Sequence, residues 1–240
     1  MTGEHFRSWA TTHVGTVRAH NEDTYVNRPE IGLWAVADGA GGHARGEVAS
    51  RMIADALSAI PGGLGAGAML AEVRNRMSAA HEALREAESG HDISASTVVV
   101  LIARDSHFAC LWAGDSRLYL LRDGHLTQIS RDHSLVQELV DAGAISAAEA
   151  ENHPRANVIT RAIGADCDIL ELDKVISRYA PGDRFLLCSD GLCKTLDEAA
   201  IAALLATPAE AEPTERLIDA ALAHNVRDNV TAVAVEVLPG

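Results

Sequence analysis

One pattern constrains this chain more than any other: a short apolar segment that ends in aspartate and is followed by a small residue. It occurs three times, and the segments are WAVADG (34–39), LWAGDS (111–116) and LLCSDG (186–191). Short apolar runs bounded by turn residues are typical of buried strands, and aspartate is disfavoured inside strands. One such aspartate is explained by a turn that starts there. Three of them, together with Asp228 just before the apolar run 230–237, favour carboxylates that several strands deliver to one place.

Hydrophobic periodicity divides the rest of the chain into helices and strands. Apolar residues recur at three and four positions in segments 46–60 and 69–85, which predicts two long helices. Asp123-Gly124 marks a tight hairpin, and Ser146 with Glu149 forms a capping-box pattern. Further helices are expected at 134–142, 146–152, 196–206 and 214–225, and strands at 33–37, 97–103, 108–113, 118–122, 126–129, 184–188 and 230–237. Helices do not alternate regularly with strands, so we expect an α+β fold with mainly antiparallel, layered sheets.

Charge and length exclude several classes of protein. The chain has 240 residues, with 20 Lys and Arg against 34 Asp and Glu, a formal net charge of −14. Such a chain is a poor nucleic-acid binder, since affinity for nucleic acid depends on clustered cations. No apolar run reaches the length of a membrane span, and residues 1–9 lack the features of a signal peptide. We therefore expect a cytoplasmic protein without a membrane partner and, from the absence of linkers, a single domain over 1–240.

The four cysteines do not indicate a metal or redox site. Cys110, Cys167, Cys188 and Cys193 form no C-x-x-C pair. Cys110 and Cys188 stand in apolar runs, so we expect buried free thiols there.

Clustered carboxylates require cations. Without them the carboxylates repel one another and raise each other's pKa. An all-oxygen cluster suits Mg²⁺ or Mn²⁺ better than zinc. Two such ions roughly 3.5–4 Å apart can activate water and clamp a phosphoryl group. An acidic chain can therefore act on a phosphate ester through bound metal.

The ordered motifs resemble those of the type 2C metal-dependent Ser/Thr protein phosphatases (the PPM family), in the short bacterial form. They extend over nearly the whole chain and are RAHNED (18–23), DGAGGH (38–43), ST (96–97), GDSR (114–117), DHS (132–134), TRAIG (160–164), SDGL (189–192) and RDNVT (227–231). The resemblance implies a central β-sandwich of two antiparallel sheets flanked by helices on both sides, with a binuclear metal site at one end.

The resemblance also implies the metal ligands. Asp38 would bridge two Mn²⁺ or Mg²⁺ ions, and Gly39 would offer its carbonyl to one of them. Asp190 and Asp228 would complete the shell of the first metal. Bacterial members hold a third, weaker metal, for which Asp115 matches the distinguishing ligand.

Further catalytic roles follow from the same resemblance. Glu22 and Asp23 would hold metal-bound waters beside the second metal, and Arg18 would grip the substrate phosphate. Water activated by the metals would attack phosphoserine or phosphothreonine directly, without a phosphoenzyme. The histidine that eukaryotic members place two residues after the bridging aspartate is Ala40 here. His43 is the candidate general acid, and water on a metal is the alternative.

The other histidines have no metal-ligand spacing and are interpreted as surface or capping residues. This group includes His5, His81, His91, His107, His125, His133, His153 and His224.

Residues 131–167 correspond to the family's flap beside the site. Arg161 falls on a family motif there, and its alternative role is a structural ion pair. Loops vary while scaffolds position, so we expect the flap to influence substrate choice.

Three functions remain in competition. The first is an active phosphoprotein phosphatase that opposes a bacterial Ser/Thr kinase and acts as a monomer. The second is a catalytically weak signalling or binding module of the same fold. The third is a metal-dependent hydrolase of small phosphate esters or nucleotides.

Overall fold

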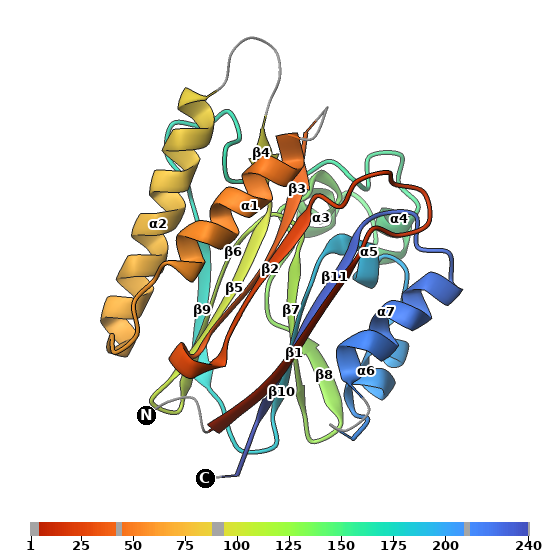
Figure 1. Cartoon of the computed structure of the whole chain (residues 1–240). Coiled ribbons are helices and arrows are strands. Elements are labelled where there is room, and N and C mark those ends of the chain that lie inside the picture. The colour runs from red at the N-terminus through yellow and green to blue at the C-terminus, as the bar shows by residue number, and fades with distance from the viewer. Residues whose placement is uncertain (1–4, 42–44, 88–93, 209–211, 240) are drawn as a thin grey trace.

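The computed structural model describes residues 5–41, 45–87, 94–208 and 212–239. Two antiparallel sheets face each other in it (Figure 1). The first sheet has the order β1-β11-β10-β7-β8, with bounds Phe6–His13, Val230–Val237, Arg184–Cys188, Arg117–Arg122 and His125–Gln128. The second has the order β2-β3-β5-β6-β9, with bounds Asp23–Arg28, Leu33–Ala40, Val98–Arg104, His107–Ala113 and Asp173–Arg178, and β4 (Ala95–Ser96) pairs with β3.

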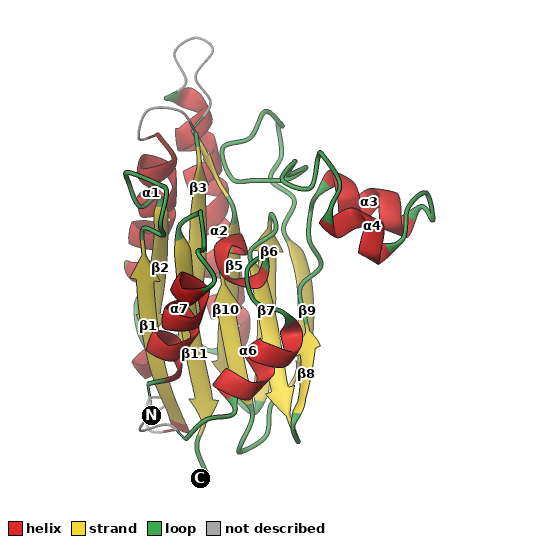
Figure 2. Ribbon diagram, turned by 90° about the vertical axis from the view of Figure 1, so that its right-hand side faces the viewer, coloured by secondary structure: helices red, strands yellow, loops and turns green. Residues whose placement is uncertain are grey.

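Helices cover the outer face of each sheet and complete four layers (Figures 1 and 2). Helices α1 (Arg45–Ser58) and α2 (Ala66–Glu86) pack on the second sheet through an apolar cluster that contains Ile53 and Met77. The short helix α5 (Asp190–Cys193), α6 (Glu198–Leu205) and α7 (Pro213–Ala223) pack on the first sheet. The predicted α+β sandwich with helices on both sides is confirmed.

The core between the sheets is built from alternate residues of the strands. Trp34, Phe108 and Phe185 are buried there, and the rings of Phe108 and Phe185 meet edge to face with centroids 5.0 Å apart. Aromatic pairs in this geometry add about 1 kcal/mol beyond the area that they bury. This layer fixes the two sheets relative to each other, and with them the strand ends that carry the carboxylates.

Sequence periodicity missed the strands β1, β2 and β9. In β9 all six residues except Val175 are exposed, and in β1 only Phe6 is fully buried. All three strands lie at sheet edges, where one side of the strand has no neighbour in the sheet. Edge strands carry polar residues that protect them from pairing with other chains, so the apolar signal is weak.

Residues 131–167 contain α3 (Leu135–Asp141) and α4 (Ala147–Glu151), which stand away from the layered body (Figure 2). The predicted capping box is present: Glu149 N donates to Ser146 Oγ, and Ser146 N donates to Glu149 Oε2 over 2.7 Å. Satisfying both end groups allows a helix of only five residues to form.

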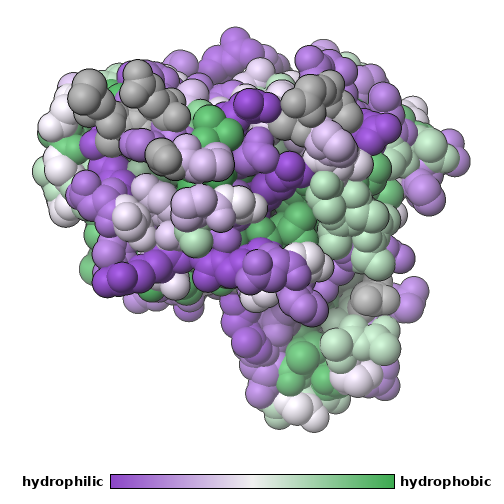
Figure 3. Space-filling view, turned by 90° about the horizontal axis from the view of Figure 1, so that it is seen from below, coloured by the Kyte–Doolittle hydropathy of each residue, from purple (hydrophilic) through white to green (hydrophobic). Residues whose placement is uncertain are grey.

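None of the helices in the described ranges is both long and apolar enough to cross a membrane. Figure 3 views the end of the sandwich away from α3 and α4, where polar residues are mixed with separate hydrophobic areas.

Candidate active site

Antiparallel pairing brings the predicted carboxylates to one end of the sandwich. Asp23 begins β2 and lies opposite Asp38 near the end of β3. Asp190 follows β10, and Asp228 precedes β11, which is antiparallel to β10. Asp115 lies between β6 and β7 at the same end. The three strand-aspartate segments therefore meet as predicted.

Asp23 is buried, with 6% of its surface exposed. Its Oδ2 accepts hydrogen bonds from Ser189 Oγ (2.8 Å) and Thr231 Oγ1 (2.7 Å). Its Oδ1 is buried and has no hydrogen-bond partner among the described residues. Burial raises the pKa of Asp23 to about 7, with smaller contributions from Asp190 and Asp228. A carboxylate in this position is stable only with a cation at the free oxygen or with a bound proton.

Asp38 is only partly buried by surface area, unlike Asp23, and its carboxyl group lies among the other aspartates. Burial raises its pKa well above the ordinary value, and the charges of Asp23, Asp190 and Asp115 raise it further. Its backbone is held firmly: the Asp38 carbonyl accepts from Thr97 N (2.9 Å) and Ser96 Oγ (3.0 Å).

Gly39 is required by the approach of α1. A Cβ at Gly39 would lie 2.1 Å from the carbonyl oxygen of Gly46, and one at Gly46 would lie 2.7 Å from the carbonyl carbon of Gly39. Because neither residue has a side chain, the first turn of α1 packs directly on the end of β3.

Asp115 and Asp190 share one cation, Lys194. Lys194 Nζ lies 2.7 Å from Asp190 Oδ2 and 3.2 Å from Asp115 Oδ2. Asp115 is 2% exposed, its Oδ1 has no hydrogen-bond partner in the described part of the chain, and burial raises its pKa to about 6 despite Lys194.

Asp228 and Arg18 form the more open side of the site. Arg18 Nε and Nη2 donate to the two oxygens of Asp228 over 2.8 and 2.7 Å, and both side chains are about half exposed. The next residue, Asn229, donates to the carbonyl oxygens of Val14 and His20 and accepts from Glu22 N. Asn229 thereby fixes the loop that carries Arg18 and Glu22 beside β11.

These residues fit hard divalent cations by donor chemistry. All the candidate ligand atoms are oxygens, and two buried carboxylate oxygens, Asp23 Oδ1 and Asp115 Oδ1, have no partner in the part of the chain that the structure describes. In the described ranges no three acidic, histidine or cysteine side chains already converge as a metal site. Lys194 and Arg18 pair with Asp190 and Asp228 instead. Arg18 occupies both oxygens of Asp228 and would have to move for a metal to bind there, whereas Lys194 contacts only Oδ2 of Asp190.

The flap is fixed at its base by charged contacts. Arg161 Nη1 donates to Asp173 Oδ1 over 2.9 Å, which fits the alternative interpretation of Arg161 as a structural ion pair. His133 Nε2 lies 3.3 Å from Asp173 Oδ2, and the backbone N of His133 donates to the Gly114 carbonyl next to Asp115. His43 and His91 lie outside the described residues.

The interpretation of every remaining histidine as a surface or capping residue is wrong for His81 and His133. His81 is 1% exposed: its Nδ1 accepts from Gly164 N, and its Nε2 lies 2.9 Å from the Cys167 carbonyl oxygen. His133 is 8% exposed, and burial lowers its pKa. Both join separate segments of the chain in the interior, a role without a short-range sequence signal. The expected buried thiols, Cys110 and Cys188, are confirmed.

Sequence reasoning missed Lys194 and Asn157, whose side chains meet over 3.0 Å. The spacing of Asp190 and Lys194, four residues apart, could have indicated the first of them, since residues at i and i+4 of a helix are neighbours. Nothing local in the sequence indicates Asn157.

The model of the protein phosphatase 2C family matches residues 17–227. The chain is 38% identical over 227 residues to the Mycobacterium tuberculosis serine/threonine protein phosphatase PstP, covering 93% of this chain but only 43% of that protein. It is 35% identical to the Listeria monocytogenes serine/threonine phosphatase stp, covering 94% and 93% of the two chains.

Solved structures agree with the sequence comparisons. The structure of Pseudomonas aeruginosa PppA, described as a key regulatory component of T6SS, has a TM-score of 0.90 and 42% identity over 98% of both chains. The PstP catalytic domain in complex with two manganese ions has a TM-score of 0.84 and 37% identity, covering 98% of this chain and 99% of that one. This chain belongs to the protein phosphatase 2C family.

Proposed function

We propose that this chain is a metal-dependent serine/threonine phosphoprotein phosphatase whose single catalytic domain extends over 1–240. One observation carries the proposal: Asp23 and Asp38, both desolvated, lie opposite each other at the end of the sandwich, and Asp23 has a buried oxygen without a partner among the described residues. Burying unpaired carboxylates is costly. A site that holds them at the end of a rigid sandwich is suited to divalent cations.

Asp38, the carbonyl of Gly39, Asp190 and Asp228 would hold two Mn²⁺ or Mg²⁺ ions, with Glu22 and Asp23 on the side of the second ion. Bound divalent ions supply an acidified water and neutralise the charge of the phosphoryl group. The strands keep the carboxylates in place before substrate arrives, because their backbones belong to paired sheets. Such preorganised charge is the main source of stabilisation in phosphoryl transfer.

Arg18 would bind the substrate phosphate. Its fork already makes two parallel hydrogen bonds to a carboxylate, and the same geometry fits two phosphoryl oxygens. About half of its side chain is exposed, so a phosphate can reach it from solvent. To do so Arg18 exchanges Asp228 for the phosphate, which leaves the Asp228 carboxylate free to bind a cation.

The leaving alkoxide requires a proton. Ala40 has no group to donate, and His43 remains the candidate acid from the sequence. If His43 serves, His43→Gln lowers kcat most for substrates with a poor leaving group and little for p-nitrophenyl phosphate.

The substrates would be phosphoserine or phosphothreonine proteins made by a bacterial Ser/Thr kinase. The names of the relatives support this class of substrate. The flap is the place where we expect substrate choice, since α3 and α4 project beside the carboxylates.

The test is Mn²⁺-dependent release of phosphate from a phosphothreonine peptide by the wild type, Asp38→Asn and Asp190→Asn. We expect activity that EDTA abolishes and that falls about a thousand-fold or more in both variants. Wild-type activity that survives EDTA, or none with Mn²⁺ or Mg²⁺, would sink the proposal and favour the binding module. Preference for a nucleotide over the phosphopeptide would favour the small-ester hydrolase.

A further inference from the structure

Lys194 lies within the carboxylate site without any assigned part in it. Its ammonium contacts three oxygens: Asp190 Oδ2 at 2.7 Å, Asp115 Oδ2 at 3.2 Å and Asn157 Oδ1 at 3.0 Å. An ammonium has three N–H donors, so these three acceptors satisfy it completely. Lys194 is the C-cap residue of α5, four positions after Asp190, so the local backbone keeps the two side chains on one face.

The resemblance to bacterial type 2C phosphatases implies that Asp115 and Asp190 are the shared ligands of a third, weaker metal, and Lys194 contacts both of them. Lys194 is the cation with which Asp115 forms an ion pair among the described residues. Five aspartates meet at this end of the sandwich: Asp23, Asp38, Asp115, Asp190 and Asp228. Arg18 offsets Glu22, and two divalent cations and one ammonium balance the five negative charges of the aspartates, whereas a third divalent cation beside Lys194 would leave an excess of positive charge.

We propose that the ammonium of Lys194 takes the place of the third metal between Asp115 and Asp190, so that this chain binds two divalent cations rather than three. The inference rests on the proposed function, because it concerns the same metal site. A divalent cation that joined Asp115 and Asp190 would have to take the Oδ2 atoms that Lys194 contacts or lie next to its ammonium, and like charges at contact distance repel strongly in a partly buried site.

The contact between Lys194 and Asn157 has a further consequence, because it involves the flap. Asn157 belongs to the flap, beyond α4, so one side chain joins the flap to the metal ligands. In a site where a third metal occupies this position, the tie would depend on the metal concentration. Because Lys194 is part of the chain, its link between the flap and the carboxylates persists when the metal concentration is low.

The experiment is isothermal titration calorimetry of the metal-free full chain with Mn²⁺ up to millimolar concentration. We compare the wild type with Lys194→Met, which keeps the length and removes the charge, and with Lys194→Arg, which keeps the charge. The wild type and Lys194→Arg should bind two ions. Lys194→Met should bind a third, with at least ten-fold higher affinity than any third event in the wild type, and adding Asp115→Asn to Lys194→Met should remove it.

Three ions bound by the wild type would overturn the inference, even if a variant fails to fold. A stoichiometry of two in a folded Lys194→Met, checked by circular dichroism, would overturn it as well. Phosphatase activity is measured separately on the phosphothreonine peptide. Two-ion binding without any activity would contradict the proposed function and leave the role of Lys194 standing, so the two failures are distinguishable.

Discussion

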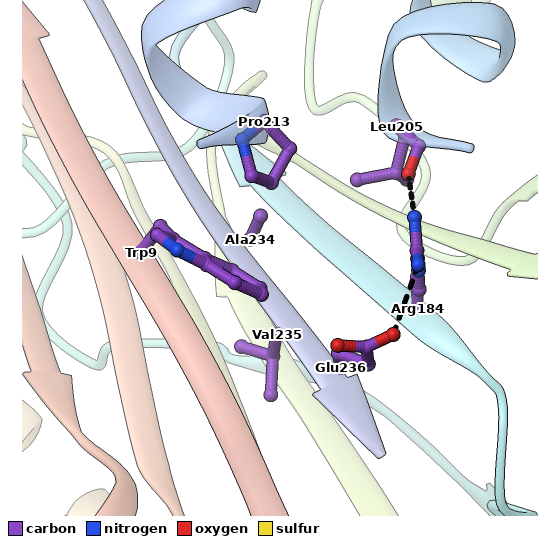
Figure 4. Close-up of a pocket in the computed structure, with 7 residues that line it drawn as sticks. All are labelled: Trp9, Arg184, Leu205, Pro213, Ala234, Val235 and Glu236. Atoms are coloured by element: carbon purple, nitrogen blue, oxygen red, sulfur yellow. Dashed lines mark hydrogen bonds and ion pairs between the residues drawn. The ribbon is translucent and has the colours of Figure 1, made fainter. Parts of the chain in front are cut away.

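Charged residues lie at or next to both ends of strands β10 and β11, and their charges are balanced differently at the two ends. At one end Arg184 and Glu236 lie opposite each other in the sheet and form an ion pair over 2.9 Å (Figure 4). Arg184 also donates to the Leu205 carbonyl over 2.7 Å and to the Thr207 carbonyl, which closes the end of α6. At the other end Asp190 and Asp228 join Asp23, Asp38 and Asp115, and negative charge exceeds the positive charge that the described side chains supply.

The two ends differ in how far the fold depends on groups from outside the chain. At the Arg184 end one carboxylate, Glu236, faces one cation, so the net charge is balanced by the chain itself, although Glu236 Oε2 is buried without a hydrogen-bond partner among the described residues. At the carboxylate end, burial and mutual repulsion raise the pKa values of Asp23, Asp38 and Asp115. Groups with such perturbed pKa values concentrate at functional sites, where binding of an ion offsets the cost. One end therefore stabilises the sandwich, and the other is suited to catalysis at the expense of stability.

Asp38→Asn should give the largest effect and should separate activity from stability. The thousand-fold loss of activity corresponds to about 4 kcal/mol in the barrier. The metal-free protein should at the same time become more stable, because a repelled buried charge is removed, with Tm higher by about 5 °C at pH 8. Calorimetry in EDTA checks the sign, and a lower Tm than that of the wild type would contradict the comparison.

Arg184→Met tests the end of the sandwich at which Arg184 pairs with Glu236. Removing one partner leaves Glu236 mostly buried and unpaired and frees the carbonyls at the end of α6, at a cost of about 3 kcal/mol or about 9 °C in Tm. We expect kcat to stay within two-fold of the wild type, because the change is at the far end of the strands.

Glu236→Gln is the matched control, since it keeps an acceptor for Arg184, and it should cost about 1 kcal/mol. If Arg184→Met lowers kcat at temperatures where it is folded, the two ends are not independent.

Arg18→Ala should weaken substrate binding with little effect on stability. The ion pair of Arg18 with Asp228 is exposed and contributes less than about 1 kcal/mol to folding. Loss of the fork should raise KM for a phosphothreonine peptide about ten-fold, which is about 1.4 kcal/mol. The KM of Arg18→Lys should lie between those of the wild type and Arg18→Ala, since lysine keeps the charge without the paired hydrogen bonds. An unchanged KM in both variants would show that Arg18 does not bind the substrate phosphate.

Asp173→Asn should give the smallest effect. It removes the half-exposed charge that Arg161 and His133 share at the base of the flap, which costs less than about 1 kcal/mol. We expect KM to rise about two- to three-fold for a phosphopeptide and to stay unchanged for p-nitrophenyl phosphate, which is too small to reach the flap. Equal changes for both substrates would indicate that the contact acts on the metal site rather than on the flap.

The sequence predicted the layers and the carboxylate end because both have local signals. Buried strands such as β5 and β10 are continuous apolar runs, and the aspartates that follow strands mark their ends. The long helices α1 and α2 lie within three residues of their predicted bounds, since their apolar stripes face the sheet.

What the sequence did not predict depends on contacts between distant segments. The polar edge strands β1 and β9 are strands because a neighbour pairs with them, not because of their own pattern. His81 and His133 are buried because loops far along the chain close over them. Lys194 is placed by Asp115 and Asn157, which are 79 and 37 residues away in the sequence.

The central claim is that the buried carboxylates make the stability of the metal-free protein depend on pH. Asp23 keeps its proton up to about pH 7 in the folded chain but releases it near its ordinary value of 3.8 when unfolded. Between these values the folded state binds more protons, so this group makes metal-free stability fall as pH rises from about 4 to 7. Asp115, with a pKa of about 6, acts in the same direction. Three pKa units correspond to a loss on the order of 4 kcal/mol for Asp23.

The most direct measurement is therefore calorimetric unfolding of the wild type at pH 5.5 and pH 8, each in EDTA and in excess Mn²⁺. We predict that Tm in EDTA is lower at pH 8 than at pH 5.5. Excess Mn²⁺ should raise Tm by about 8 °C or more at pH 8, where the carboxylates are ionised, and by less than about 2 °C at pH 5.5, where protons compete. An equal rise at both pH values, or a metal-free protein that is more stable at pH 8, would contradict the account.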